Sequence, residues 1–272
     1  MHLEPFQWIT GALAALLVGI SKTGVPGIGI LVVPLLSLGF GGRLGAGVML
    51  PLLIMGDVFA VAWYRRHCQW AKLVGLLPWV VVGMAFGTAA LWITGGDKGS
   101  KDATDVVIGA LVLVMVALHL LRNKLGDRLT PTSPAGVAGT GTAAGFATTV
   151  SNAAGPVMQM YLAAYKMPKE RFMGTIAVYF FLINVSKFPI YVALSRIIPQ
   201  KPIVTTSSLA LNAAVFPAVV VGVYIGKWLL PRLSQKAFEM VIVLLSFLGA
   251  AWLIAKFFGL DRIIANCLEH TP

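Results

Sequence analysis

A single lysine interrupts the first long apolar segment of the chain. Lys22 lies in "GISKTGVPGIGI", residues 19–30, between Ser21 and Thr23 and before a run of glycines and a proline. A lysine at bilayer depth is costly unless it is paired or hydrated. We predict that Lys22, with the Ser21 and Thr23 hydroxyls and nearby amides, contacts a small anion. The alternative is that its ammonium extends to water at one face of the membrane.

Glycines beside Lys22 are expected to shape the backbone at the same place. Gly24, Gly27 and Gly29 are predicted to form a turn that breaks the helix and to approach a ligand closely. A helix that begins after such a break presents unpaired N–H groups and about half a positive charge, which favours an anion. Such groups are tolerated at membrane depth only where they line a cavity. Close helix packing through small residues is the alternative, for Gly29 above all.

A second break, "TTVSNAAGP" at residues 148–156, contains no charged residue. Its hydroxyl and amide groups can donate hydrogen bonds to a ligand, and we predict that Ser151, Asn152 and Gly155 bind the substrate. Gly155 is expected to begin the second half-helix. Ser151 or Asn152 could also cap that half-helix, and the two roles are compatible.

Further polar residues lie inside predicted spans. Asp57 is the carboxylate farthest inside one, in "PLLIMGDVFAVAWYRR". An intramembrane acid indicates a partner for Lys22 or Lys187, or a proton carrier; a purely structural salt bridge is the alternative. Asn184 and Lys187 lie in "YFFLINVSKFPIY", the corresponding span of the second half. Both are predicted to bind the substrate, and Lys187 could instead pair with Asp57 or extend to water.

The composition indicates what must position these residues. Of the 272 residues, 58% are hydrophobic and 11% are charged, which is typical of a protein that crosses a membrane several times. The net charge of +11 comes from short loops between apolar segments, so we expect membrane lipids as partners and no nucleic acid. The chain has no metal-site, nucleotide-loop or hydrolase motif, and we expect no metal, no cofactor and no enzymatic activity.

Apolar segments close to the roughly 20 residues of a membrane span alternate with two longer, interrupted regions. The interrupted regions are 6–39 and 135–165, and their halves, at about 10–15 residues each, are expected to be too short to cross. The predicted spans are 44–64, 72–94, 104–121, 171–195, 203–226 and 237–258. A shift of 126 residues places Gly19 on Gly145 and Gly29 on Gly155. We therefore predict a first repeat over 1–125, a linker over 126–134 and a second repeat over 135–272.

The distribution of Lys and Arg favours re-entrant hairpins over crossing segments. If both interrupted regions enter and leave on one face, the basic residues gather on one side of the membrane, whereas crossing divides them almost evenly. A hairpin plus three spans is an odd number of crossings, so the second repeat starts on the opposite face. The predicted fold is an all-α polytopic membrane protein with two inverted repeats, each a broken re-entrant hairpin plus three transmembrane helices, with both termini outside the cytoplasm.

These segments also resemble a known family. "GISKTGVPGIGILVVPLL" and "GVMLPLLIMGDVFAVAWYRRHCQW" resemble the TauE/SafE family of sulfite and organosulfonate exporters, and "GFATTVSNAAGPVMQMYLAAYKMPKERFMGTIAVYFFLINVSKFPIY" resembles its repeated domain. The family's second glycine-rich motif is poorer in glycine here. The resemblance implies export of sulfite or an organosulfonate across a bacterial inner membrane.

The residues and the resemblance together predict a secondary transporter that moves a small anion by alternating access. An anion channel, a transporter of small carboxylates and a membrane subunit that transports nothing are the alternatives. H+ is one option for the coupling ion, and a homodimer is one option for the assembly.

Overall fold

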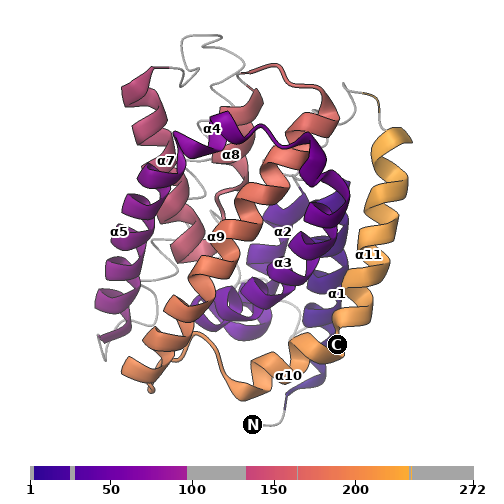
Figure 1. The fold of residues 1–272 in the computed structure, drawn as a ribbon. Helices are drawn as coiled ribbons and strands as arrows, with labels where there is room; N and C mark the ends of the chain where they lie inside the picture. Colours follow the sequence, from indigo (N-terminus) through magenta and orange to yellow (C-terminus); the bar gives the residue numbers. More distant parts are fainter. Residues whose placement is uncertain (1–2, 25–27, 97–132, 164, 233, 235–272) are drawn as a thin grey trace, which may run out of the picture.

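The computed structural model describes residues 3–24, 28–96, 133–163, 165–232 and 234 (Figure 1). Helices are the regular structure of this part of the chain, which contains no strand. They are α1 Pro5–Thr23, α2 Gly29–Phe40, α3 Gly42–Tyr64, α4 Trp70–Val74, α5 Leu77–Gly96, α7 Pro134–Ser151, α8 Gly155–Ala163, α9 Lys169–Ile197, α10 Thr206–Ala214 and α11 Phe216–Leu229. The predicted spans 104–121 and 237–258 lie outside the described residues, as does Gly27.

Within the described ranges, three helical segments are long and apolar enough to cross a membrane. They are Gly42–His67, Leu77–Thr94 and Lys169–Ile197. These segments match the predicted spans 44–64, 72–94 and 171–195. The described part of the chain is therefore all-α, with helices suited to a membrane.

The predicted span 203–226 is bent rather than one straight helix. The chain forms two helices there, Thr206–Ala214 and Phe216–Arg232, which are bent by 49° relative to each other and together could make a fourth span. Pro217 lies in the first turn of α11. Its ring and its missing N–H weaken a continuous helix through this point, but suit the start of a new one.

The first interrupted region is a pair of antiparallel helices. At the break, a Cβ built on Gly29 would lie 2.8 Å from Ser21 Oγ. At the other end, Gln7 Nε2 donates a hydrogen bond to Gly39 O at 3.1 Å. The chain thus turns back after α1, and α2 returns to the level at which α1 begins.

The second interrupted region also turns back on itself. α7 descends beside α5, so that a Cβ on Gly141 would meet Leu76 O. Near the end of α8, Tyr161 Oη donates a hydrogen bond to Lys72 O at 2.9 Å. Because Lys72 and Leu76 are close in sequence, α8 ends at the same end of the bundle at which α7 begins.

The two hairpins have arms of unequal length, which differs from the expected halves of about 10–15 residues. α1 has 19 residues and α7 has 18, whereas α2 has 12 and α8 has 9. The long arms extend because Lys22 and Thr23 are still helical, and so are Thr148 to Ser151. Each break therefore comes later in the chain than the middle of its interrupted region.

The helices form two groups that meet along a central pair. One apolar cluster joins α1, α2, α3 and α11, and another joins α5, α7, α8 and α9. α3 and α9 pack against each other between the groups (Figure 1). Small residues bring backbones together inside each group: a Cβ on Gly19 would meet Val219 O, and one on Gly145 would meet Val80 O.

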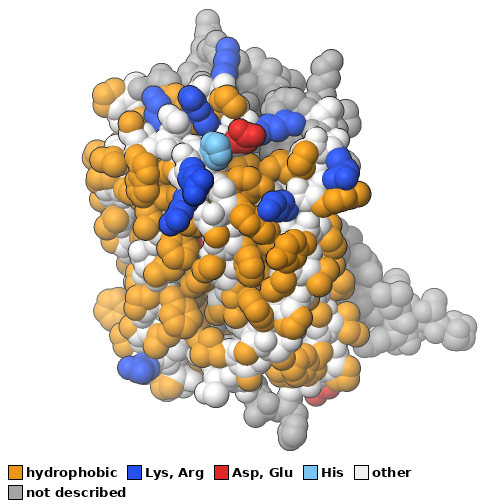
Figure 2. All heavy atoms as spheres, turned by 45° about the vertical axis from the view of Figure 1, so that its right-hand side comes forward, with side chains coloured by type: hydrophobic (Ala, Val, Ile, Leu, Met, Phe, Trp, Pro, Cys, Tyr) orange, Lys and Arg blue, Asp and Glu red, His pale blue; other side chains and the backbone are white. Residues whose placement is uncertain are grey.

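The surface of the molecule is apolar over its middle. Figure 2 shows hydrophobic side chains along the length of the helices, with Lys and Arg gathered towards one end. On α5, Val81, Phe86 and Ile93 are exposed, and on α11 so are Tyr224 and Trp228. An apolar belt with basic residues beyond it is typical of a protein integral to a membrane.

Candidate substrate-binding site

A cavity lies where the two hairpins meet the central helices. It encloses about 650 Å³, part of it open to the surroundings. Seven of the predicted site residues line it: Ser21, Lys22, Gly29, Asp57, Asn152, Gly155 and Asn184. Apolar side chains, among them Val33, Leu53 and Phe180, form much of the remaining wall. The two halves of the sequence thus contribute to one cavity.

Two helices begin at this cavity. Gly29 is the first residue of α2 and Gly155 is the first residue of α8, and both line the cavity. The N-cap residue of α2, Ile28, has no side chain that accepts a hydrogen bond from the first turn. First-turn N–H groups have no partner within the helix and carry part of the positive end of its dipole. The cavity therefore has two positive helix ends in its wall.

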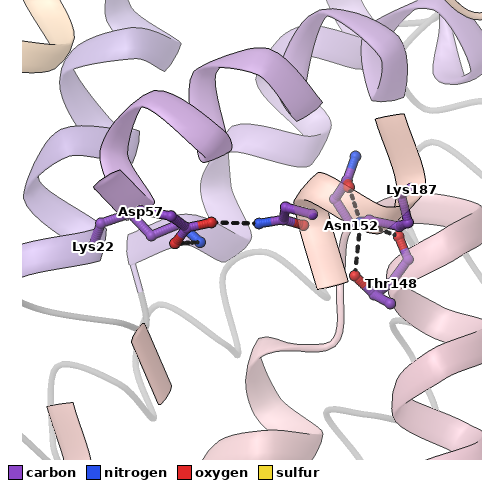
Figure 3. Close-up of polar contacts among 6 residues, drawn as sticks. Lys22, Asp57, Thr148, Asn152 and Lys187 are labelled. Atoms are coloured by element: carbon purple, nitrogen blue, oxygen red, sulfur yellow. Dashed lines mark hydrogen bonds and ion pairs between the residues drawn. The ribbon is translucent and has the colours of Figure 1, made fainter. Parts of the chain in front are cut away.

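Lys22 forms an ion pair at the edge of the cavity. Its Nζ lies 2.7 Å from Asp57 Oδ1, and Asn184 Nδ2 donates a hydrogen bond to Asp57 Oδ2, also at 2.7 Å (Figure 3). Asp57 and Asn184 are fully buried, whereas Lys22 retains 10% exposure. Lys22 Nζ also lies 4.5 Å from the centroid of the Phe180 ring. Since an ammonium has three donors, Lys22 can hold Asp57 and still donate to an anion.

Lys187 has a separate environment, also visible in Figure 3. Its Nζ donates to Thr148 O at 2.9 Å, to Thr148 Oγ1 at 2.8 Å and to Asn152 Oδ1 at 2.6 Å. The side chain is fully buried, which excludes the alternative that it extends to water. It does not pair directly with Asp57, because all three ammonium donors bind the end of α7. Lys187 thus stabilises the chain at the second break, because its ammonium interacts favourably with the negative C-terminal end of α7.

Asn152 and Ser151 belong to the end of α7 rather than to the start of α8. Asn152 is the C-cap residue of α7, in the left-handed region with φ 56°, which asparagine tolerates better than most residues. Its Nδ2 donates to Ala46 O at 3.0 Å. Ser151 Oγ donates to Ala147 O at 3.0 Å, a bond inside its own helix. These side chains therefore do not cap the second half-helix, which was the alternative role for them.

Thr23 and Gly24 face away from the cavity. Thr23 Oγ1 lies 2.7 Å from Val223 O and 3.1 Å from Gly19 O, both acceptors for its hydroxyl. A Cβ on Gly24 would meet the backbone of Gly226. Both residues thus pack α1 against α11, which is the alternative role that small residues have at helix contacts.

Several residues of the cavity were not predicted as binding residues from the sequence. Thr148, Gln159 and Phe180 line it, and the Gln159 side chain is only 3% exposed. Gln159 lies four residues after Gly155 in "GPVMQMYLA", on the same face of α8. A lone amide in an apolar stretch, one turn after a helix start, was the signal available. Among the described residues, no group of His, Cys, Asp or Glu side chains could hold a metal ion.

Because Lys187 stabilises the second break, we expect its replacement to destabilise the protein. In Lys187→Met, the Asn152 and Thr148 acceptors lose a charged donor inside the protein, so we expect about 1–3 kcal/mol of destabilisation per acceptor left unpaired. Thermal unfolding of the purified protein in detergent measures this. Lys227→Met, the same change at an exposed position, is the control. Equal unfolding temperatures for the two variants would contradict a stabilising role of Lys187.

Comparison with known proteins places the chain in a family. No curated protein and no solved structure matches it. The sequence model of a protein family, described as "Sulfite exporter TauE/SafE", matches residues 11–253. This range contains both helix breaks, the central helices α3 and α9, and every residue of the cavity wall. A membrane-integral helical chain that matches over nearly its whole length is a member: the chain belongs to the TauE/SafE family of sulfite exporters.

Proposed function

We propose that this chain is a secondary transporter that moves a small anion, sulfite or an organosulfonate, by alternating access. The observation that supports this most is the convergence of two helix N-termini, at Gly29 and Gly155, on the cavity that Lys22 also lines. The family supplies sulfite and the direction of export. The geometry supplies a place for a negative charge.

The electrostatic balance of the cavity favours a monoanion. Each helix N-terminus contributes about half a positive charge. Lys22 and Asp57 cancel each other while they are paired at 2.7 Å. Their surroundings are largely apolar, and charge interactions are stronger there than in water. The negative C-terminal ends of α1 and α7 also reach the cavity, and the Lys187 ammonium offsets them. The sum is therefore close to one positive charge, which a single negative charge would neutralise.

The directions of the hairpins support inverted repeats. The first hairpin, α1 and α2, starts and ends at the end of the bundle where Gln7 meets Gly39. The second, α7 and α8, starts and ends where Tyr161 meets Lys72. α3 runs from the first of these ends to the second, because it starts close in sequence to Gly39 and ends close in sequence to Lys72. Near its start, Arg43 donates a hydrogen bond to Lys201 O, and its last residue, Tyr64, lies beside Gly174. We assign 1–125 and 135–272 to two inverted repeats joined by 126–134, with alternating access arising from movement of one against the other.

The basic end of the molecule is proposed to face the cytoplasm of a bacterium whose inner membrane holds the protein. Arg65, Arg66 and Lys72 lie beyond the end of α3, and Lys169 and Arg171 lie at the start of α9, which packs against the same loop. Short loops rich in Lys and Arg remain on the cytoplasmic side. Both hairpins then reach the cavity from opposite faces.

Transport by purified protein in liposomes tests this proposal. We expect labelled sulfite to enter vesicles preloaded with unlabelled sulfite at a saturable rate, because a carrier exchanges one bound anion for another. A channel would give flux without such counterflow, and a subunit without transport activity would give neither. Repeating the assay with sulfonates and small carboxylates of equal charge identifies the substrate class.

A further inference from the structure

Gln159 presents an unpaired amide to the cavity. Its side chain is 3% exposed, and neither Nε2 nor Oε1 has a hydrogen-bond partner among the described residues. Asn184 Oδ1 is also buried without such a partner. The orientation of the Asn184 amide follows from Asp57, because only its Nδ2 can donate to that carboxylate. The cavity thus offers one unused amide donor group and two unused acceptors.

Unused acceptors are informative about a ligand. A buried polar group without a partner is costly, so a ligand that completes these hydrogen bonds binds better than one that does not. The oxygens of a fully deprotonated oxyanion only accept hydrogen bonds. Such an ion satisfies the helix N-termini, Lys22 and Gln159 Nε2, but leaves Gln159 Oε1 and Asn184 Oδ1 facing other oxygens. A ligand with a donor group of its own satisfies at least one of them.

The position of Gln159 brings this amide close to the proposed anion site. A Cβ on Gly155 would lie 3.8 Å from Gln159 Nε2, so the side chain folds back towards the start of α8. Val33, Leu53 and Ile176 form apolar wall around these polar groups. Methylene groups suit such a wall, whereas a bare oxyanion does not use it.

We propose that Gln159 is a specificity-determining residue whose Oε1 accepts a hydrogen bond from the substrate, and that the substrate is an alkanesulfonate carrying a hydroxyl group. This rests on the proposed function and narrows it. The sulfonate lies at the N-terminal ends of α2 and α8, the carbon chain contacts the apolar wall, and the hydroxyl donates its one hydrogen bond to Gln159 Oε1.

Two sulfonates that differ by one hydroxyl test this inference. Calorimetric titration of the purified protein with ethanesulfonate and with 2-hydroxyethanesulfonate gives their affinity ratio. We expect the hydroxylated compound to bind about tenfold more tightly to the wild type, the effect of one good hydrogen bond. In Gln159→Met, which keeps the side-chain length, the ratio should fall several-fold towards one. Gln69→Met, the same change outside the cavity, should keep the wild-type ratio.

The possible outcomes separate this inference from the proposed function. A wild type that binds both sulfonates equally, or a Gln159→Met variant that keeps the full preference, overturns the inference and leaves anion transport standing. A wild type that binds neither sulfonate and shows no sulfite counterflow in liposomes overturns both the inference and the proposed function. Gln159→Glu covers the case in which the Met variant does not fold: it keeps acceptor oxygens, so the hydroxyl preference should persist while both affinities fall. Loss of that preference in folded Gln159→Glu overturns the inference.

Discussion

In the Lys22→Met variant, we expect sulfite counterflow and sulfonate binding to fall by about 100-fold or more. The change removes the cation that faces the cavity and leaves Asp57, which is fully buried, as an unopposed negative charge 2.7 Å from where the ammonium was. At a separation of about 4 Å and an effective dielectric constant of about 20, two unit charges interact by about 4 kcal/mol. An arriving anion thus loses an attraction and meets a repulsion.

A double variant separates this effect from misfolding. Lys22→Met alone strands a buried carboxylate, which can destabilise a protein by about 3–5 kcal/mol. Lys22→Met combined with Asp57→Asn removes both charges and should recover much of the thermal stability while anion binding stays weak. Lys227→Met, at an exposed position, controls for the loss of a lysine as such. Normal counterflow in folded Lys22→Met would remove Lys22 from the site.

The helix breaks were predictable because their cause is local. Glycine and proline in "SKTGVPGIG" and "TTVSNAAGP" disfavour helix, and α8 does begin at Gly155 as predicted, whereas Gly29, predicted to lie in the turn, begins α2. The need for a partner was also predictable, since a charge such as Asp57 is rarely left alone inside a membrane. The partner that Asp57 takes could not be predicted, because the sequence contains two candidate lysines in apolar segments.

The structure decides between those lysines through groups that have no charge. Lys187 is satisfied by Thr148 and Asn152 at the end of α7, and no spacing rule links position 187 to position 148. Lys22 is left for Asp57. The neutral acceptors at a helix C-terminus thus determine which lysine remains available to the cavity.

Which residues of α1 face the cavity could not be predicted without knowing where the helix ends. Successive helical residues point about 100° apart, so Ser21 and Lys22 line the cavity while Thr23 and Gly24 contact α11. Had the helix ended before Lys22, the same residues would have formed one turn around the ligand. The bend before α11 has the same character: Pro217 is visible in the sequence, but apolar residues on both sides of it concealed two short helices.

We expect the pH dependence of transport to disappear in Asp57→Asn. An anion that enters beside Lys22 is repelled by the negative charge of the Asp57 carboxylate, so protonation of Asp57 should favour anion binding. The charged groups that act on Asp57 are Lys22 from α1, paired at 2.7 Å, and Lys187 from α9.

A proton would then move together with the anion, so that in a cell the outward gradient of the anion itself has to drive export, and the sign of the pH effect follows from the charges. Wild-type uptake should rise as the pH falls and should be driven by a proton gradient. Asparagine imitates the protonated acid at every pH, so Asp57→Asn should exchange anions at a rate that no longer varies with pH and should not respond to the gradient. Uptake into liposomes with and without an imposed pH difference measures both. Glu170→Gln, the same change at an exposed position, should keep the wild-type profile, and a pH profile unchanged in Asp57→Asn would exclude this carboxylate as the proton carrier.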